Sequence, residues 1–187
     1  EAEVSIITGD TKVVEKGALD ECVINTSGIG RRSEYLDANL REVRKYREFD
    51  ARWLLDSNLH PGDKVIVSGT IGDHGLAILS QREGYEFETE IISDVKPLNR
   101  LAARLLQVGG VVKMKDPTRG GLANTLHEWS EKSKVGFRIF EEAIPIREGV
   151  RAACEMLGID PLEVGNEGKL VIGVVASKAE QLLSVLK

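Results

Sequence analysis

The sequence predicts a layered α/β or α+β domain. From about residue 61 onward, short apolar runs rich in β-branched residues alternate with segments whose apolar residues recur at helical spacing. The chain has 187 residues, of which 42% are hydrophobic, and this is enough for one good core. Periodicity leaves open whether the sheet is parallel or mixed.

The first sixty residues predict two short strands and a helical connector. Residues 4–8 and 22–26 are β-branched runs separated by glycines and charges, as in neighbouring strands joined by a loop. Residues 31–58 are highly charged, and their apolar residues have an imperfect helical spacing. A turn at 60–63 marks the expected domain boundary, so the predicted division is 1–30, 31–60 and 61–187. Because the chain opens directly in a strand pattern, we expect it to be part of a longer protein.

The second part of the chain predicts an alternating series of strands and helices. Helices are indicated by one apolar face and by glycines that follow their last residue, and a capping box is expected at Ser177 and Glu180. The predicted strands are 64–68, 111–114, 136–140 and 170–175. The predicted helices are 76–79, 93–108, 124–132, 147–157 and 179–186.

Composition excludes several classes of function. The net charge is −5 with both signs interspersed, so there is no basic field for nucleic acid. No apolar run is long enough to span a bilayer, and no leader pattern begins the chain, so we expect a cytoplasmic protein with no membrane partner. Cys22 and Cys154 form no metal-binding pattern and are predicted to be reduced and packed.

Asp10, Thr11 and Lys12 follow the first predicted strand, where α/β proteins place ligands. Asp10 is a hard oxygen ligand suited to Mg²⁺, and Lys12 would neutralise phosphate charge. The alternative is an ordinary turn with a solvated lysine. The connection at 69–75 is rich in glycine, which favours anion binding near a helix start. The alternative is a tight strand-to-helix turn in which His74 makes a local hydrogen bond.

Residues 116–121, with the sequence DPTRGG, predict a helix start at which Asp116 is the N-cap. Gly120 and Gly121 would cost roughly 1 kcal/mol each relative to alanine inside a helix, so something gains from approaching that backbone closely. With Thr118 and Arg119 beside them, a bound phosphate is one candidate, and close helix packing is the other.

Glu167 lies between Gly165 and Gly168, just before an apolar strand. A glutamate at the mouth of a rigid element can act as a general base or as a metal ligand. The alternative is a surface turn in which Glu167 and Lys169 form a charge pair.

Taken in order, these motifs resemble the hydrogenase expression/formation proteins of the HypE type, which are related to aminoimidazole ribonucleotide synthetase, selenophosphate synthetase and thiamine-monophosphate kinase. The matching text covers nearly the whole chain except 31–58, and the strings GDTKVV, GDHG and NEGKL indicate HypE rather than its relatives. The motifs are GDTKVV at 9–14, NTSGIG at 25–30, IGDHG at 71–75, DPTRGGL at 116–122, IPIRE at 144–148 and NEGKL at 166–170.

The resemblance implies that residues 1–30 end an N-terminal domain that binds ATP and forms a dimer, and that the rest is a C-terminal domain of the aminoimidazole ribonucleotide synthetase type. It implies that Asp10 binds Mg²⁺, that Asp10, Thr11 and Lys12 approach ATP, and that Asp116, Thr118, Arg119, Gly120 and Gly121 line the phosphates. Lys12 and Glu167 would be catalytic.

The implied reaction is the ATP-dependent dehydration of a carbamoyl group, carried on a C-terminal cysteine, to a thiocyanate that supplies the cyanide ligand of nickel-iron hydrogenase. Implied partners are a HypF-type carbamoyltransferase, HypC- and HypD-type assembly proteins and a second copy of the chain. Because the cysteine tail and most of the ATP domain are outside this sequence, we expect the chain alone to be inactive. The alternatives are a related ATP-dependent kinase or synthetase, or a non-catalytic docking module.

Overall fold

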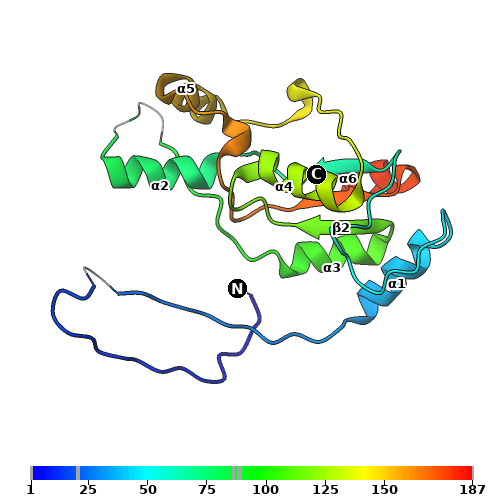
Figure 1. The fold of residues 1–187 in the computed structure, drawn as a ribbon, viewed down its shortest axis with the longest axis horizontal. Coiled ribbons are helices and arrows are strands. Elements are labelled where there is room, and N and C mark those ends of the chain that lie inside the picture. Colours follow the sequence, from blue (N-terminus) through cyan, green and yellow to red (C-terminus); the bar gives the residue numbers. More distant parts are fainter. Residues whose placement is uncertain (1, 20–21, 86, 88–89, 187) are drawn as a thin grey trace.

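A three-stranded antiparallel sheet forms the centre of the protein in a computed structural model that describes residues 2–19, 22–85, 87 and 90–186. The strands are β1 (Lys64–Val67), β2 (Val111–Lys115) and β3 (Val171–Val174), in the order β1-β3-β2 (Figure 1). In the register, Ile172 of the central strand lies opposite both Ile66 and Met114. The sheet is therefore neither parallel nor mixed.

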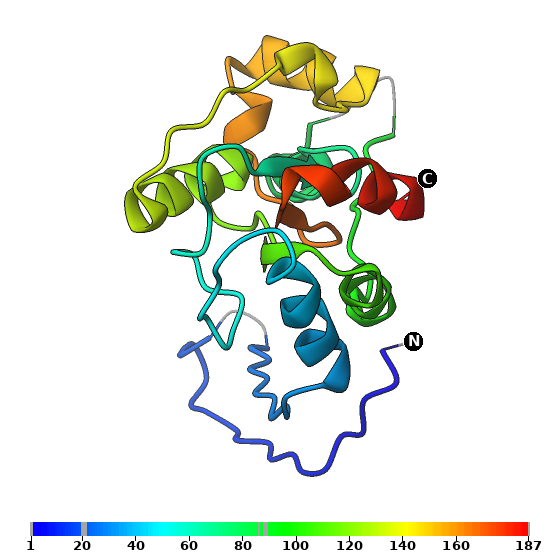
Figure 2. The same cartoon turned by 90° about the vertical axis from the view of Figure 1, so that its right-hand side faces the viewer.

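Helices cover both faces of this sheet. The side chains of β3 alternate, so that Ile172 and Val174 pack in one apolar cluster and Val171 and Val175 in another. The first cluster includes α3 and α6, and the second includes α1 and α4; in Figure 2, α3 and α6 lie on one side of the sheet and α4 on the other. The helices are α1 (Glu34–Val43), α2 (Asp73–Glu83), α3 (Asn99–Val108), α4 (Gly121–Ser133), α5 (Glu148–Leu157) and α6 (Ala179–Leu186).

Within the described residues, three short 3-10 helices join these elements. Helix α2 packs on α5 through a third, smaller apolar cluster. The 3-10 helices are η1 (Glu141–Ala143), η2 (Pro161–Glu163) and η3 (Ala176–Lys178). None of the described helices has the length and apolar character needed to cross a membrane. The predicted layered α/β class is confirmed, as are the strands near 64, 111 and 170 and the final helices.

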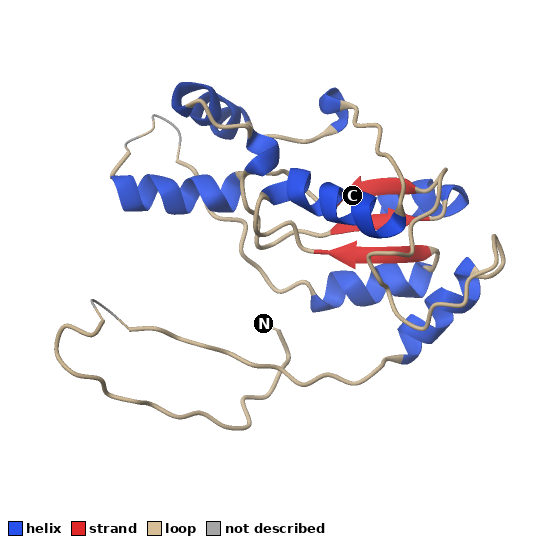
Figure 3. Cartoon of the chain, viewed as in Figure 1, coloured by secondary structure: helices blue, strands red, loops and turns tan. Residues whose placement is uncertain are grey.

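The predicted strands at 4–8 and 22–26 are wrong. Both segments run as extended, exposed chain without strand pairing, and Ile6 is 94% exposed (Figure 3). β-branched residues favour strands only when a neighbouring strand and a packed face support them. For the same reason Cys22 is exposed rather than packed, whereas Cys154 is buried, and burial raises the pKa of its thiol.

Further differences concern local structure. Residues 136–140 form no strand and are irregular. Helix α3 begins at Asn99, so residues 93–98 are not helical. Ser177 lies inside η3 instead of capping α6, because a 3-10 turn precedes that helix.

The segment 31–58 is helical only in α1, which Ser33 caps by accepting a hydrogen bond from the Leu36 N–H. This helix is part of the packed core. Its buried Asn39 side chain donates to the carbonyl oxygen of Val111 at 2.7 Å and accepts from the Val111 N–H at 2.8 Å. A single amide thereby satisfies both backbone groups of the first residue of β2.

Candidate functional site

Three loops meet at one edge of the sheet. Because β1 and β2 both run antiparallel to β3, the ends of β1 and β2 lie beside the start of β3. The buried Asn166 joins the loops: its side chain accepts from the Gly72 N–H at 2.8 Å, and its backbone N–H donates to the Pro117 carbonyl at 3.0 Å. The motifs at 71–75, 116–121 and 166–170 therefore form one site although they are far apart in the sequence.

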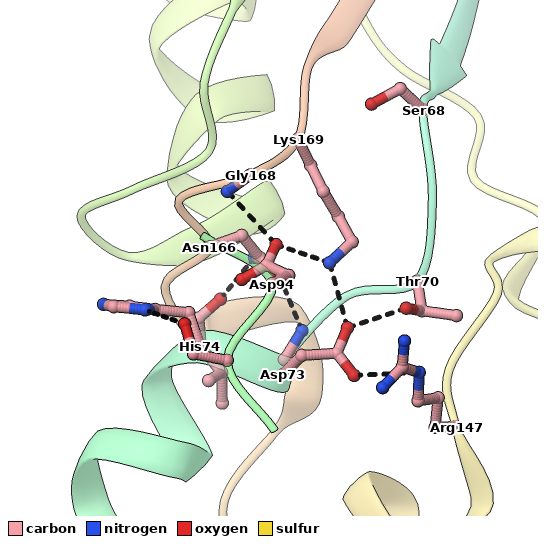
Figure 4. A network of polar contacts seen from close by, with 12 residues as sticks. Ser68, Thr70, Asp73, His74, Asp94, Arg147, Asn166, Gly168 and Lys169 are labelled. Carbon is pink, nitrogen blue, oxygen red and sulfur yellow. Dashed lines mark hydrogen bonds and ion pairs between the residues drawn. The ribbon is translucent and has the colours of Figure 1, made fainter. Parts of the chain in front are cut away.

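The centre of this site is a buried cation between two carboxylates. The Lys169 ammonium donates to Asp73 Oδ2 at 2.9 Å and to Asp94 Oδ2, and the side chains of all three residues are at most 6% exposed (Figure 4). Thr70 Oγ1 also donates to Asp73 Oδ2, at 2.7 Å, and Arg147 Nε lies 3.3 Å from Asp73 Oδ1. Buried charges are tolerated only when they are paired in this way.

The environment of Asp94 favours its ionised form. Burial is the largest single influence and acts to raise the pKa of this carboxyl group. Hydrogen bonding to Lys169, attraction to its charge and backbone hydrogen bonds outweigh burial, so the pKa is lowered from its ordinary value. Asp94 therefore carries a negative charge at neutral pH.

His74, in the first turn of α2, makes a second contact with the segment around Asp94. Its Nδ1 lies 2.8 Å from the hydroxyl oxygen of Ser93, the residue before Asp94. The hydrogen bond of His74 is therefore not local as expected, because its partner Ser93 lies 19 positions away in the sequence.

Glycines allow the loops to approach closely. Gly121 has a φ of +60°, and a Cβ at this position would lie 2.6 Å from the Val164 carbonyl oxygen and nearer still to that of Leu162. The helix α4 begins here, after the left-handed N-cap Gly120, so the prediction that Asp116 caps it is wrong. Asp116 instead accepts a hydrogen bond from the Thr118 hydroxyl. The close packing that we weighed for Gly121 is confirmed.

The residues predicted to bind ligands are divided between two places. Thr118 and Glu167 are half-buried in the loop cluster, with Asp116, Arg119 and Gly120 exposed at its surface. Asp10, Thr11 and Lys12 are exposed on the N-terminal segment, and within the described part of the chain no hydrogen bond or ion pair joins them to the loops. The described residues also include no cluster of three or more His, Cys, Asp or Glu side chains arranged to hold a metal. The roles of all these residues stay predictions.

Sequence reasoning missed the buried network. The alternative of a surface pair between Glu167 and Lys169 is wrong, because Lys169 is 4% exposed and pairs with Asp73 and Asp94. Asp73 and Lys169 lie inside the GDHG and NEGKL strings, so the motifs carried a signal. Asp94 lies in a stretch predicted as helix, and no pattern distinguished it.

A comparison with protein families matches residues 60–187 to the AIR synthase related protein, C-terminal domain, and the chain belongs to that family. Among individual proteins, the chain is 48% identical over 189 residues to the carbamoyl dehydratase HypE of Bradyrhizobium diazoefficiens, with all of this chain and 50% of that protein covered. It is thus similar to HypE proteins over its whole length, as the motifs indicate, and spans about half the length of the curated relatives it matches.

Solved structures of HypE proteins have the same fold. The crystal structure of a HypE–HypF complex matches with a TM-score of 0.70 and 49% identity, over 71% of this chain and 44% of that one. A HypE in complex with ATP matches with a TM-score of 0.68 and 46% identity, over 71% and 40% of the two chains.

Proposed function

We propose that the full-length protein containing this chain is an ATP-dependent carbamoyl dehydratase of hydrogenase maturation. The observation that carries the proposal is 48% identity, along the entire chain, to a protein named carbamoyl dehydratase HypE. The convergence of the three motifs on one site supports it, because a reaction between a nucleotide and a tethered substrate needs both held together.

In this proposal the loop 116–121 faces the phosphates of ATP, and Asp10 contributes an oxygen ligand to Mg²⁺. Lys12 stabilises the charge of the transferred phosphoryl group. The carbamoyl oxygen, carried on a C-terminal cysteine, attacks the terminal phosphate and ADP leaves. Removal of the nitrogen-bound protons and departure of phosphate then give the thiocyanate. Glu167 is the proposed base for a proton on the carbamoyl nitrogen.

The proposal extends to domains and partners. Residues 1–30 would end an ATP-binding and dimerisation domain, and 61–187 would be the C-terminal domain. Residues 31–60 would connect the two while α1 packs into the core of the second. A HypF-type carbamoyltransferase would supply the carbamoyl group, HypC- and HypD-type proteins would accept the product, and the full-length protein would act as a cytoplasmic homodimer. A solved HypE–HypF complex of a 49% identical relative supports the first of these partners.

Mass spectrometry of the C-terminal peptide tests the reaction. The full-length gene product is carbamoylated and then given Mg-ATP, in the wild type and in Glu167→Gln. We expect the wild-type peptide to lose one water and the variant peptide to keep it. Glu163→Gln is the control, because Glu163 is exposed in the neighbouring η2, and it should react like the wild type. An unchanged wild-type mass would refute the proposed activity.

Nucleotide binding is tested separately by calorimetry on the full-length protein. We expect Asp10→Ala and Arg119→Ala each to weaken Mg-ATP binding about tenfold or more, because each removes a charge from the proposed phosphate and metal contacts. Arg151→Ala, an exposed arginine on α5, should bind ATP normally. Equal affinity in all three variants would mean that the nucleotide contacts other residues.

A further inference from the structure

We propose that Asp94 and Lys169 are positioning residues that hold the backbone of Glu167, and that the rate of dehydration depends on them. This inference rests on the proposed function, since it gives Glu167 its role in the reaction. The motif comparison singled out Glu167, and nothing in the sequence indicated what fixes it in place. The buried network of Asp73, Asp94 and Lys169 lies beside it and holds it.

The first support is the hydrogen bonding of the loop backbone. Asp94 Oδ2 accepts a hydrogen bond from the Gly168 N–H at 3.3 Å. This N–H belongs to the peptide unit that follows the Glu167 Cα, and hydrogen bonds to a charged acceptor are stronger than neutral ones. The Asp94 carboxylate therefore holds the peptide unit on the C-terminal side of Glu167.

The second support is the close contact of this loop with residue 94. A Cβ at Gly168 would collide with the Asp94 carbonyl oxygen, so only glycine fits at 168. The backbone after Glu167 therefore lies directly against the segment that carries the Asp94 carboxylate.

The third support is the anchor behind Asp94. Lys169 bridges Asp94 to Asp73, and Asp73 is the completely buried first residue of α2. Ser93, next to Asp94, is bonded to His74 of the same helix. The irregular segment around residue 94 is thus joined to α2 by two contacts, one through Lys169 and one through His74. Helix α2 is the regular element that supports the loop carrying Glu167.

Such an arrangement matters most for the chemical step. A base must lie within hydrogen-bond reach of its proton, and a misplacement of about 1 Å can lower a rate about 100-fold. ATP binding, in contrast, is proposed to depend on the loop 116–121 and on the N-terminal residues. Loss of the Asp94 carboxylate should therefore affect the turnover rate and not the KM for ATP.

The experiment uses the carbamoylated full-length protein and measures kcat and KM for ATP, together with hydrogen exchange of the loop amides. For Asp94→Asn we expect kcat to fall about 10- to 100-fold with KM for ATP within about twofold of wild type. We also expect faster exchange of the Gly168 amide, which loses its charged acceptor. Asp63→Asn is the matched control. Asp63 pairs with the half-buried Arg47 at 2.8 Å outside the loop cluster, so the variant should lose stability but keep kcat and the exchange of the Gly168 amide.

Unchanged kcat in Asp94→Asn, alongside loss of activity in Glu167→Gln, would overturn the positioning role and leave the proposed function intact. An equal loss of kcat in Asp63→Asn would also overturn it, because the effect would then follow stability alone. Full activity of Glu167→Gln would instead refute the proposed role of Glu167, so the two failures are distinguishable.

Discussion

At the scale of single residues, the dominant feature is an ammonium group buried between two carboxylates. Lys169 comes from the start of β3, Asp73 from the first turn of α2 and Asp94 from an irregular segment, so one cation joins three parts of the chain. A buried pair of this kind adds little compared with apolar packing, but the removal of one partner leaves an uncompensated charge. The network therefore makes the fold sensitive to single substitutions.

Lys169→Met should lower the free energy of unfolding by about 3–5 kcal/mol, because Asp94 would be left buried without a cation and Asp73 would keep only the exposed Arg147. Urea denaturation followed by circular dichroism measures the change. Lys45→Met is the control. Lys45 pairs with Glu42 at 2.6 Å but is 67% exposed, so its loss should leave the free energy of unfolding nearly unchanged. Equal effects of the two substitutions would show that the network contributes no special stability.

At the scale of elements, a pattern was predictive where an element is stabilised by its own sequence and packing. The continuous apolar run of β3 and the apolar faces of α4 and α5 identified these elements. The strands expected at 4–8, 22–26 and 136–140 failed, because a strand depends on a neighbour that its own sequence does not specify. Pairing partners are a property of the whole fold.

Glycine positions show a second limit. The sequence indicated that Gly120 and Gly121 must permit a close approach, but not what approaches. The structure shows that the carbonyl groups at the end of η2 contact Gly121. The helix therefore starts five residues after Asp116, although the Asp-Pro pair favours an earlier start.

Gly121→Ala should destabilise the domain by about 3 kcal/mol or more, because it adds a steric collision to the cost of a positive φ. Gly158→Ala is the control: Gly158 has a φ of +67°, and a Cβ there would meet nothing within 4 Å, so the expected cost is only about 1–2 kcal/mol. Thermal unfolding of both variants measures the two losses of stability. A smaller loss in Gly121→Ala than in Gly158→Ala would contradict the close contact with η2.

At the scale of the whole molecule, the packed part of the chain begins at α1 and residues 2–19 and 22–30 lie outside it as exposed chain (Figure 1). The contacts of this segment with the domain include an ion pair between Glu3 and Arg100 and a hydrogen bond from Asn99 to the Ala2 carbonyl. Exposed ion pairs of this kind stabilise little.

Deletion of residues 1–30 should therefore change the free energy of unfolding of the 187-residue chain by no more than about 1 kcal/mol. Chemical denaturation of the two chains measures this difference. A loss of several kcal/mol would mean that the N-terminal segment packs on the domain in solution.

Acid should weaken the protein through carboxylates whose pKa is lowered by folding. Burial acts to raise the pKa of Asp56, but hydrogen bonds and attraction from Lys113 and Lys132 lower it from 3.8 to about 2. This stabilisation is present above about pH 4 and is lost as the pH falls toward 2. In Asp56→Asn we expect lower stability at pH 7 and a shallower decline between pH 4 and 2, measured by urea denaturation at each pH. Parallel curves for the wild type and the variant would contradict the ion pairs.

For the site, the sequence identified the motifs and their family, whereas their meeting depends on the antiparallel order β1-β3-β2. Periodicity could not specify that order. Glu167 was identified by its glycine neighbours, but Asp94, the residue that holds its backbone, occupies a stretch without a motif.

The most direct test of the central claim is a crystal structure of the full-length protein with a carbamoylated C-terminal cysteine and a non-hydrolysable ATP analogue. We expect the phosphates to lie against residues 116–121 and the carbamoyl group to lie within hydrogen-bond distance of Glu167. Asp94 should accept the Gly168 N–H as in Figure 4. A nucleotide or carbamoyl group bound away from the three loops would contradict it.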